Sequence, residues 1–153
     1  MVKVLDTFSY VSVLRELTEE GKMVNLLVAG NSMSPFLIHH RDFIYFEKPK
    51  RELKKGDPVF YQRDSGQFVM HRICRVNEDG TYNLIGDNQT VIEPGIRRDQ
   101  IFALVIMVKR KGKIIKPGDF WWEFFARVWV NVIPLRRGIS KAYGILTFWK
   151  RVR

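Results

Sequence analysis

Two short stretches of the sequence carry residue types that could do hydrolytic chemistry. The first, Gly30-Asn31-Ser32-Met33-Ser34-Pro35, is a turn of small residues that presents a hydroxyl at Ser32. Its proline fixes the backbone that follows. The second, Val69-Met70-His71-Arg72, places an imidazole at His71 in an apolar, strand-like run. A hydroxyl is a poor nucleophile until a base takes its proton, so a serine and a histidine that meet in the fold are what a hydrolase needs.

A third stretch, Leu84-Ile85-Gly86-Asp87-Asn88, supplies an acid that could orient the imidazole. Each of the three groups also has an ordinary structural interpretation. Ser32 could cap a turn, His71 could be a hydrogen-bonded strand residue, and Asp87 could serve the turn after a strand. The paired residues His39 and His40 have no further ligand at metal-site spacing, which favours a solvated turn.

The elements that must position these residues are mostly strands. Apolar residues recur at helical spacing over residues 4–20, and Gly21 ends that helix. Short strand-like runs separated by Gly, Pro and Asp turns then follow, at residues 23–28, 42–47, 58–62, 67–76, 82–85 and 101–108. The pattern predicts a mostly β domain with a coiled, barrel-like or sandwich core.

The composition changes near Pro117. The formal net charge is +10, and residues 117–153 contribute seven Lys/Arg against two Asp/Glu as well as all four tryptophans. We therefore divide the chain into an N-terminal helix at 1–21, a β domain at 22–116 and a basic, aromatic tail at 117–153. The single cysteine, Cys74, excludes an internal disulfide, and its apolar surroundings favour a buried structural thiol.

These blocks, in this order and spacing, resemble the signal peptidase I and repressor-cleavage peptidase superfamily, which are serine peptidases on a coiled β core. The resemblance spans about residues 23–108 and puts Ser32 in the place of the nucleophile. His71 stands in the place of the general base. Most bacterial enzymes of the family carry a lysine at this position, whereas the endoplasmic-reticulum, archaeal and sporulation-type signal peptidases carry a histidine. The segments Gly56-Asp57-Pro58 and Gly86-Asp87-Asn88 resemble two further family motifs.

The sequence departs from the family pattern at two positions. Gly30 replaces a serine whose hydroxyl helps to form the oxyanion hole, so the second donor must come from a backbone N–H, Asn31 or Ser34. Losing one such donor costs roughly two to three orders of magnitude in rate. Glu93 replaces an aspartate that follows the Gly-Asp-Asn motif. Either Asp87 or Glu93 could therefore orient His71, and we favour Asp87.

The predicted reaction is acyl transfer to water, without a cofactor or a metal. Ser32 attacks the peptide carbonyl, and His71 takes the hydroxyl proton and then returns it to the leaving amine. An unperturbed histidine titrates near 6.5, so activity should rise between about pH 6 and 7.5. The substrate would be an extended peptide precursor or leader peptide, cut after a small residue such as alanine.

The tail suggests a membrane surface as a partner. The apolar stretch 120–133 would span about 21 Å as a helix, which is shorter than the ~30 Å hydrocarbon core. Tryptophans interleaved with Lys and Arg suit the headgroup region, so we expect residues 119–153 to lie on an anionic membrane. Packing on the β core, a dimer contact and nucleic-acid binding are the alternatives, the last being the least favoured.

The sequence predicts a peripheral serine endopeptidase on the cytoplasmic side of a membrane, because it shows neither a secretory signal nor a spanning segment. The second hypothesis is a catalytically inactive peptidase-like β domain that serves as a binding or regulatory module. A self-cleaving repressor is disfavoured, because residues 1–22 are too few for a DNA-binding helix-turn-helix.

Overall fold

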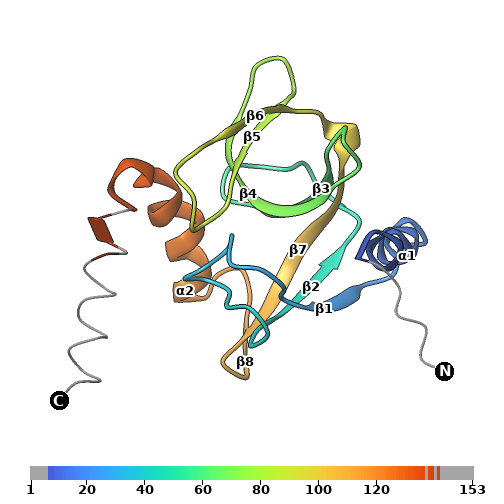
Figure 1. Ribbon diagram of the computed structural model, residues 1–153, viewed down its shortest axis with the longest axis horizontal. Coiled ribbons are helices and arrows are strands. Elements are labelled where there is room, and N and C mark those ends of the chain that lie inside the picture. The colour runs from blue at the N-terminus through green and yellow to red at the C-terminus, as the bar shows by residue number, and fades with distance from the viewer. Residues whose placement is uncertain (1–6, 137, 140, 142–153) are drawn as a thin grey trace.

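A computed structural model of the chain describes residues 7–136, 138, 139 and 141. They form an eight-stranded antiparallel sheet with one helix before it and a helical segment after it (Figure 1). The strands are β1 Val24–Leu27, β2 Phe43–Glu47, β3 Pro58–Gln62, β4 Phe68–Val76, β5 Tyr82–Ile85, β6 Glu93–Ile96, β7 Ile101–Arg110 and β8 Lys113–Ile115. Their order is β1-β2-β7-β3-β4-β5-β6, and β8 pairs with β7. The predicted mostly β fold is confirmed, although the coiled sheet does not close into a barrel.

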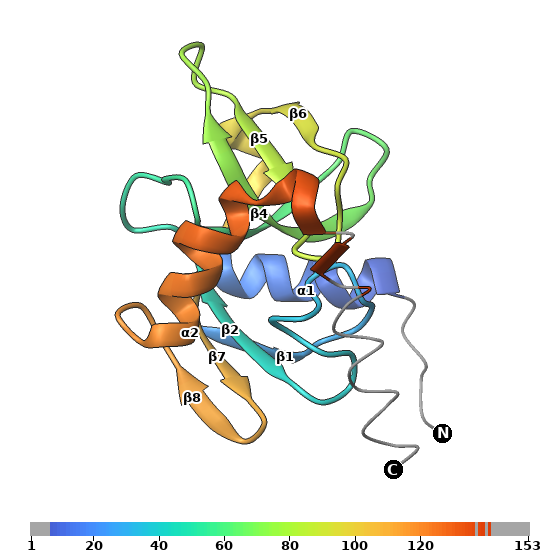
Figure 2. The ribbon, with the colours of Figure 1, turned by 90° about the vertical axis from the view of Figure 1, so that its left-hand side faces the viewer.

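The predicted N-terminal helix is also confirmed. Helix α1 spans Thr7–Glu19 and lies beside β1 and β7 (Figures 1 and 2). The chain turns away from the helix at Gly21, which has a φ of +83° and donates its N–H to the carbonyl of Thr18. The left-handed conformation that glycine adopts readily is a common way to end a helix. The predicted residues 4–6 lie outside the described residues.

Apolar side chains cover both faces of the central strands, and they form two main clusters. Strand β3 separates the two, because its successive side chains point to opposite faces. Phe60 packs into the cluster that also holds α1 and β2, whereas Val59 and Tyr61 pack into the cluster under β5 and β6. Strand β7 also contributes residues to both clusters.

The hairpin of β3 and β4 fixes the register of the residues around His71. Val59 pairs with His71, and Tyr61 pairs with Val69. Tyr61 and His71 therefore share one face as diagonal neighbours on adjacent strands, while Arg72 points to the opposite face. Strand β5 pairs with residues 72–76 of β4. In the described part of the chain, the half of β4 from Phe68 to His71 is thus paired on one side only.

The helical segment after β8 packs against the sheet. It consists of α2 at Phe120–Glu123, a π-helical turn at Phe124–Val128, and 3₁₀ turns at Trp129–Asn131 and Ile133–Leu135. A further 3₁₀ turn, Arg98–Gln100, precedes β7. Trp122, Phe125 and Trp129 are buried in the same cluster as α1 and β2. Residues beyond the predicted boundary at 117 therefore complete the core of the β domain. For these residues, the structure matches the alternative in which the tail packs on the β core.

No helix within the described ranges combines the length and the apolar character needed to cross a bilayer. Most of the basic C-terminal end of the predicted tail, residues 142–153, lies outside those ranges. The position of the helical segment is visible in Figure 2, where it rises from the β8 hairpin along the side of the molecule toward β4.

The contact between Gly56 and the helical segment can be tested. Gly56 has a φ of +98°, and a Cβ there would lie 2.6 Å from the carbonyl oxygen of Ala126. The left-handed conformation costs an alanine about 1–2 kcal/mol, and the overpacking adds about 1–3 kcal/mol. We expect Gly56→Ala to lower the free energy of unfolding by about the sum, measured by urea denaturation.

Gly118→Ala is the matched control, because Gly118 has a φ of +97° and no atom within 4 Å of the added Cβ. It should cost only the conformational part, about 1–2 kcal/mol. Equal losses in the two variants would contradict the packing of Ala126 on Gly56.

Candidate active site

Ser32 and His71 line the same groove. The groove has a volume of about 870 Å³ and runs between the segment that follows β1 and the half-paired end of β4. Val28, Ala29 and Gly30 form one wall, and Phe68 to His71 form the other. The fold therefore brings the two predicted catalytic residues, 39 positions apart in the sequence, to one surface depression.

The turn that carries Ser32 is held by backbone hydrogen bonds. The N–H of Ser34 donates to the carbonyl of Asn31 at 3.1 Å, and the N–H of Leu37 donates to that of Met33 at 2.9 Å. Met33 is buried in the core, which anchors the turn from below. Ser34 lines a different cavity on the other side of the turn. Of the two serines in the turn, Ser32 lines the groove.

The segment Gly86-Asp87-Asn88 supports this turn directly. The N–H of Asn88 donates to the carbonyl of Ser32 at 2.9 Å. A Cβ on Gly86 would lie 2.5 Å from that same carbonyl oxygen. Residue 86 must therefore be a glycine for the Gly-Asp-Asn segment to approach the Ser32 turn this closely. The glycine of the motif thus has a structural role.

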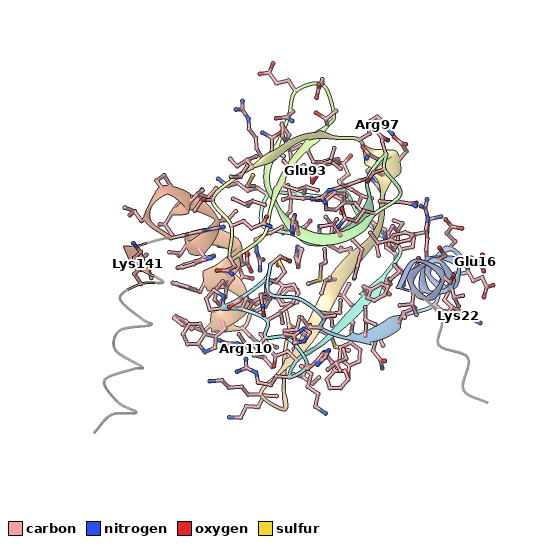
Figure 3. All side chains as sticks on the ribbon, in the orientation of Figure 1. Glu16, Lys22, Glu93, Arg97, Arg110 and Lys141 are labelled. Atoms are coloured by element: carbon pink, nitrogen blue, oxygen red, sulfur yellow. The ribbon has the colours of Figure 1, made fainter. Side chains whose placement is uncertain are left out.

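His71 is almost fully buried, with 3% of its surface exposed. Its Nδ1 lies 3.2 Å from the hydroxyl of Tyr61, and this hydroxyl also hydrogen-bonds to the carboxylate of Glu93. Arg63 donates its Nε–H to Glu93 at 2.7 Å. Figure 3 labels Glu93 in the part of the molecule formed by β5 and β6. A continuous chain of polar groups thus runs from the imidazole to a carboxylate.

Electrostatics favour a neutral imidazole and a charged carboxylate in this chain. Burial lowers the pKa of His71 from 6.5 to about 4, and the nearby charge of Glu93 offsets part of that effect. Burial alone would raise the pKa of Glu93, but hydrogen bonds from Arg63 and Tyr61 outweigh it and hold this pKa below its ordinary value. Burial and the neighbouring Glu93 raise the pKa of Tyr61, so its hydroxyl keeps its proton.

Asp87 has a different partner from the one we favoured. Its two carboxylate oxygens accept hydrogen bonds from Nε and Nη2 of Arg72 at 2.8 and 2.9 Å, and both side chains are fully buried. Arg72 also donates to the carbonyl of Gly56 at 2.8 Å. The hydrogen bonds therefore connect His71 to Glu93 and not to Asp87, because His71 and Arg72 point to opposite faces of β4.

Gly30 contributes backbone conformation in place of the family's hydroxyl. It has a φ of +89°, a region that side chains with a Cβ seldom adopt. Its N–H donates to Nδ1 of His39 at 2.7 Å. His39, which the sequence indicated as part of a solvated turn, thus helps to hold the segment that leads to Ser32. Asn31 is exposed in the same turn.

Sequence reasoning missed Tyr61 and Arg63, and it missed the contact of His39 with Gly30. The hairpin loop at residues 63–66 could have given the register that sets Tyr61 beside His71, because pairing across a short loop is fixed. It also missed Trp129, whose Nε1–H donates to the carbonyl of Asp87 at 2.8 Å. No local signal marks that contact.

Fold and groove together define a class of protein: a mostly β domain that places a serine and a histidine beside one depression. The chain matches the Peptidase S24-like family model over residues 3–113, and it belongs to that family. No curated protein and no solved structure matches the chain significantly. The resemblance to this superfamily is therefore confirmed at the level of the S24-like domain.

Gly86→Ala tests whether the Gly-Asp-Asn segment positions Ser32. The added Cβ would displace the Ser32 backbone, and a misplacement of about 1 Å can cost roughly 100-fold in rate. We expect a serine-reactive phosphonate to label Ser32 at least about tenfold more slowly in this variant. Gly138→Ala is the control, because nothing lies within 4 Å of its Cβ. An unchanged rate in a folded Gly86→Ala protein would remove the positioning role.

Proposed function

We propose that this protein is a serine endopeptidase of the signal-peptidase-like type, which cuts an extended peptide through Ser32 and His71. The observation that carries the proposal is the common groove of these two residues, with His71 tied through Tyr61 to the carboxylate of Glu93. Membership of the S24-like family supports a peptidase domain. The nucleophile, the base and the signal-peptidase-like specificity belong to the proposal.

The chain of hydrogen bonds sets the tautomer of His71. Tyr61 has one proton, and the charged Glu93 is the stronger acceptor for it. The oxygen of Tyr61 is then free to accept the proton on Nδ1 of His71. Nε2 is left with its lone pair, which is the form that a general base needs. Glu93 and Tyr61 together would do what a single aspartate does in a Ser-His-Asp triad.

Three steps follow from this arrangement. Nε2 of His71 takes the proton of the Ser32 hydroxyl while the hydroxyl oxygen of Ser32 attacks the peptide carbonyl. The imidazolium then gives this proton to the leaving amine, and water hydrolyses the acyl-enzyme in the same way. Glu93 stabilises the transient positive charge. The tetrahedral oxyanion would be held by the N–H of Ser32 and by Asn31, because Gly30 has no side chain and Ser34 lines the other cavity.

Two strand edges beside the groove favour an extended peptide as the substrate. Strand β1 is the terminal strand of the sheet path, and the end of β4 from Phe68 to His71 is paired with β3 alone among the described strands. A peptide in the groove could hydrogen-bond to these edges as an added strand. Cleavage after a small residue, which the resemblance implies, stays a prediction.

Ser32→Ala is the direct test of the nucleophile. A serine-reactive phosphonate probe, followed by mass spectrometry of the intact protein, should label the wild type once and Ser32→Ala not at all. Ser34→Ala is the matched control, because it removes a hydroxyl from the same turn but from the other cavity, and it should label normally. Labelling of Ser32→Ala, or none of the wild type, would contradict the proposal.

Tyr61→Phe tests the orientation of the base. For the wild type, the labelling rate should be constant from about pH 5 to 8 and fall as His71 gains a proton near pH 4, because only the neutral imidazole is a base. Without the Tyr61 hydroxyl, the tautomer is no longer fixed, and the plateau should drop at least about tenfold. Tyr45→Phe is the control on β2.

The pH profile of the wild type also separates two expectations. A rise between pH 6 and 7.5 would match an unperturbed histidine, as the sequence alone predicted, and it would contradict the effect of burial. A plateau of Tyr61→Phe equal to that of the wild type would remove Tyr61 from the mechanism.

An inactive peptidase-like binding module is the second candidate function. The burial of His71 and the absence of a hydroxyl at Gly30 are the observations that favour it. In that case the groove would bind a peptide without cutting it, and the wild type would resist the phosphonate probe.

A further inference from the structure

An exposed apolar face lies at the end of the molecule opposite β5 and β6. It consists of Ile114 in β8 and of Phe120 and Trp121 at the start of α2, whose exposed fractions are 49%, 72% and 45%. The hairpin of β7 and β8 lies beside α2 in both ribbon views (Figures 1 and 2). We call these three residues, together with Lys111 and Lys113 of the hairpin, the hairpin face.

The hairpin face surrounds a second depression, of about 910 Å³. Phe124, Ile139, Pro35 and Ile38 also line it, the last two from the segment that follows Ser32. Large aromatic side chains that stay exposed next to an apolar depression are typical of an interaction site. Their neighbour Trp122 is buried, so the exposure of Phe120 and Trp121 is specific to this side of α2.

The charge around the hairpin face is positive. Lys111 and Lys113 are exposed, and the described residues provide no ion pair for either. The carboxylate of Asp42 accepts the backbone N–H of Lys111 at 3.1 Å and is buried against Arg41, and that of Asp119 accepts the N–H of Lys116. The partner must therefore accept exposed aromatic rings and supply negative charge.

We propose that the hairpin face docks the protein on an anionic lipid bilayer. Aromatic residues favour the headgroup region, where the ring reaches the acyl boundary and lysines beside it meet lipid phosphates. Nucleic acid fits less well, because stacking on bases requires free rings. Here the guanidinium of Arg110 lies over Trp121 at 5.3 Å, and Phe120 stacks on Phe124.

The hairpin face is connected to the Ser32 turn. Arg110 donates to the carbonyls of Phe36 and Pro35 at 2.9 and 3.3 Å while its guanidinium covers Trp121. Figure 3 labels Arg110 at this end of the molecule. A docked protein would thus hold the Ser32 turn close to the lipid surface. If the proposed function is correct, peptides at the membrane surface are its substrates, but the docking itself does not depend on catalysis.

Vesicle co-sedimentation of the full chain tests the proposal. We expect binding to vesicles of phosphatidylcholine with 30% phosphatidylglycerol, and at least about tenfold weaker binding to phosphatidylcholine alone. Ile114→Ser/Phe120→Ser should weaken binding at least about tenfold, because both side chains leave the apolar layer. Lys111→Gln/Lys113→Gln should weaken it roughly 10- to 30-fold at low salt.

Matched controls separate the hairpin face from general charge and hydrophobicity. Val91→Ser removes an apolar side chain that is 78% exposed elsewhere, and Lys48→Gln/Arg75→Gln removes two exposed charges away from the face. Both controls should bind as the wild type does. Circular dichroism and thermal unfolding confirm that every variant is folded.

Three results would overturn the proposal. The first is no binding of the wild type to anionic vesicles. The second is binding that survives in both hairpin-face variants, which would assign it to another surface. The third is a wild-type dimer that Phe120→Ser dissociates, together with no vesicle binding, which would make the face a contact between two copies. Loss of phosphonate labelling would leave the docking result unaffected, so the two proposals fail separately.

Discussion

The structure depends on one buried ion pair, that of Arg72 and Asp87. Its guanidinium and carboxylate form two hydrogen bonds out of contact with water, and the guanidinium also binds the carbonyl of Gly56 and lies over the ring of Phe36 at 5.2 Å. The pair thereby joins β4, the loop before β3, the segment after Ser32 and the Gly-Asp-Asn motif. Removal of one partner from such a pair typically costs about 3–5 kcal/mol, because the other charge is left buried without compensation.

Because Asp87 is paired with Arg72, the two acids near His71 have different hydrogen-bond partners. Asp87 neutralises Arg72 on one face of β4, so it holds the segment that supports Ser32. Glu93 lies on the other face with Tyr61 and His71, where it can act on the imidazole. His71 and Arg72 point to opposite faces of β4, and the fold places one carboxylate on each face.

The C-terminal helical segment is part of the same assembly. Trp129 donates to the carbonyl of Asp87, and Arg136 donates to the carbonyls of Gly86 and Gln89 at 2.9 and 3.0 Å. The Gly-Asp-Asn motif, which contacts the Ser32 carbonyl, is therefore held by hydrogen bonds from residues more than 40 positions later in the chain. The same helical segment exposes Phe120 and Trp121 on the hairpin face. A ligand bound there would therefore contact a segment that also hydrogen-bonds to the Gly-Asp-Asn motif.

The sequence by itself determined the parts that depend on local patterns. Apolar runs between turn residues predicted six of the eight strands, but not β6 and β8. Helical spacing and Gly21 predicted α1, and the motifs around Ser32 and His71 gave the two residues that the fold brings to one groove. The family followed from the same motifs. Only the tertiary structure decided which acid serves which partner, because this depends on the face of β4 that each carboxylate reaches. It also decided that residues 122–130 complete the core, since contacts across such long separations leave no local signal in the sequence.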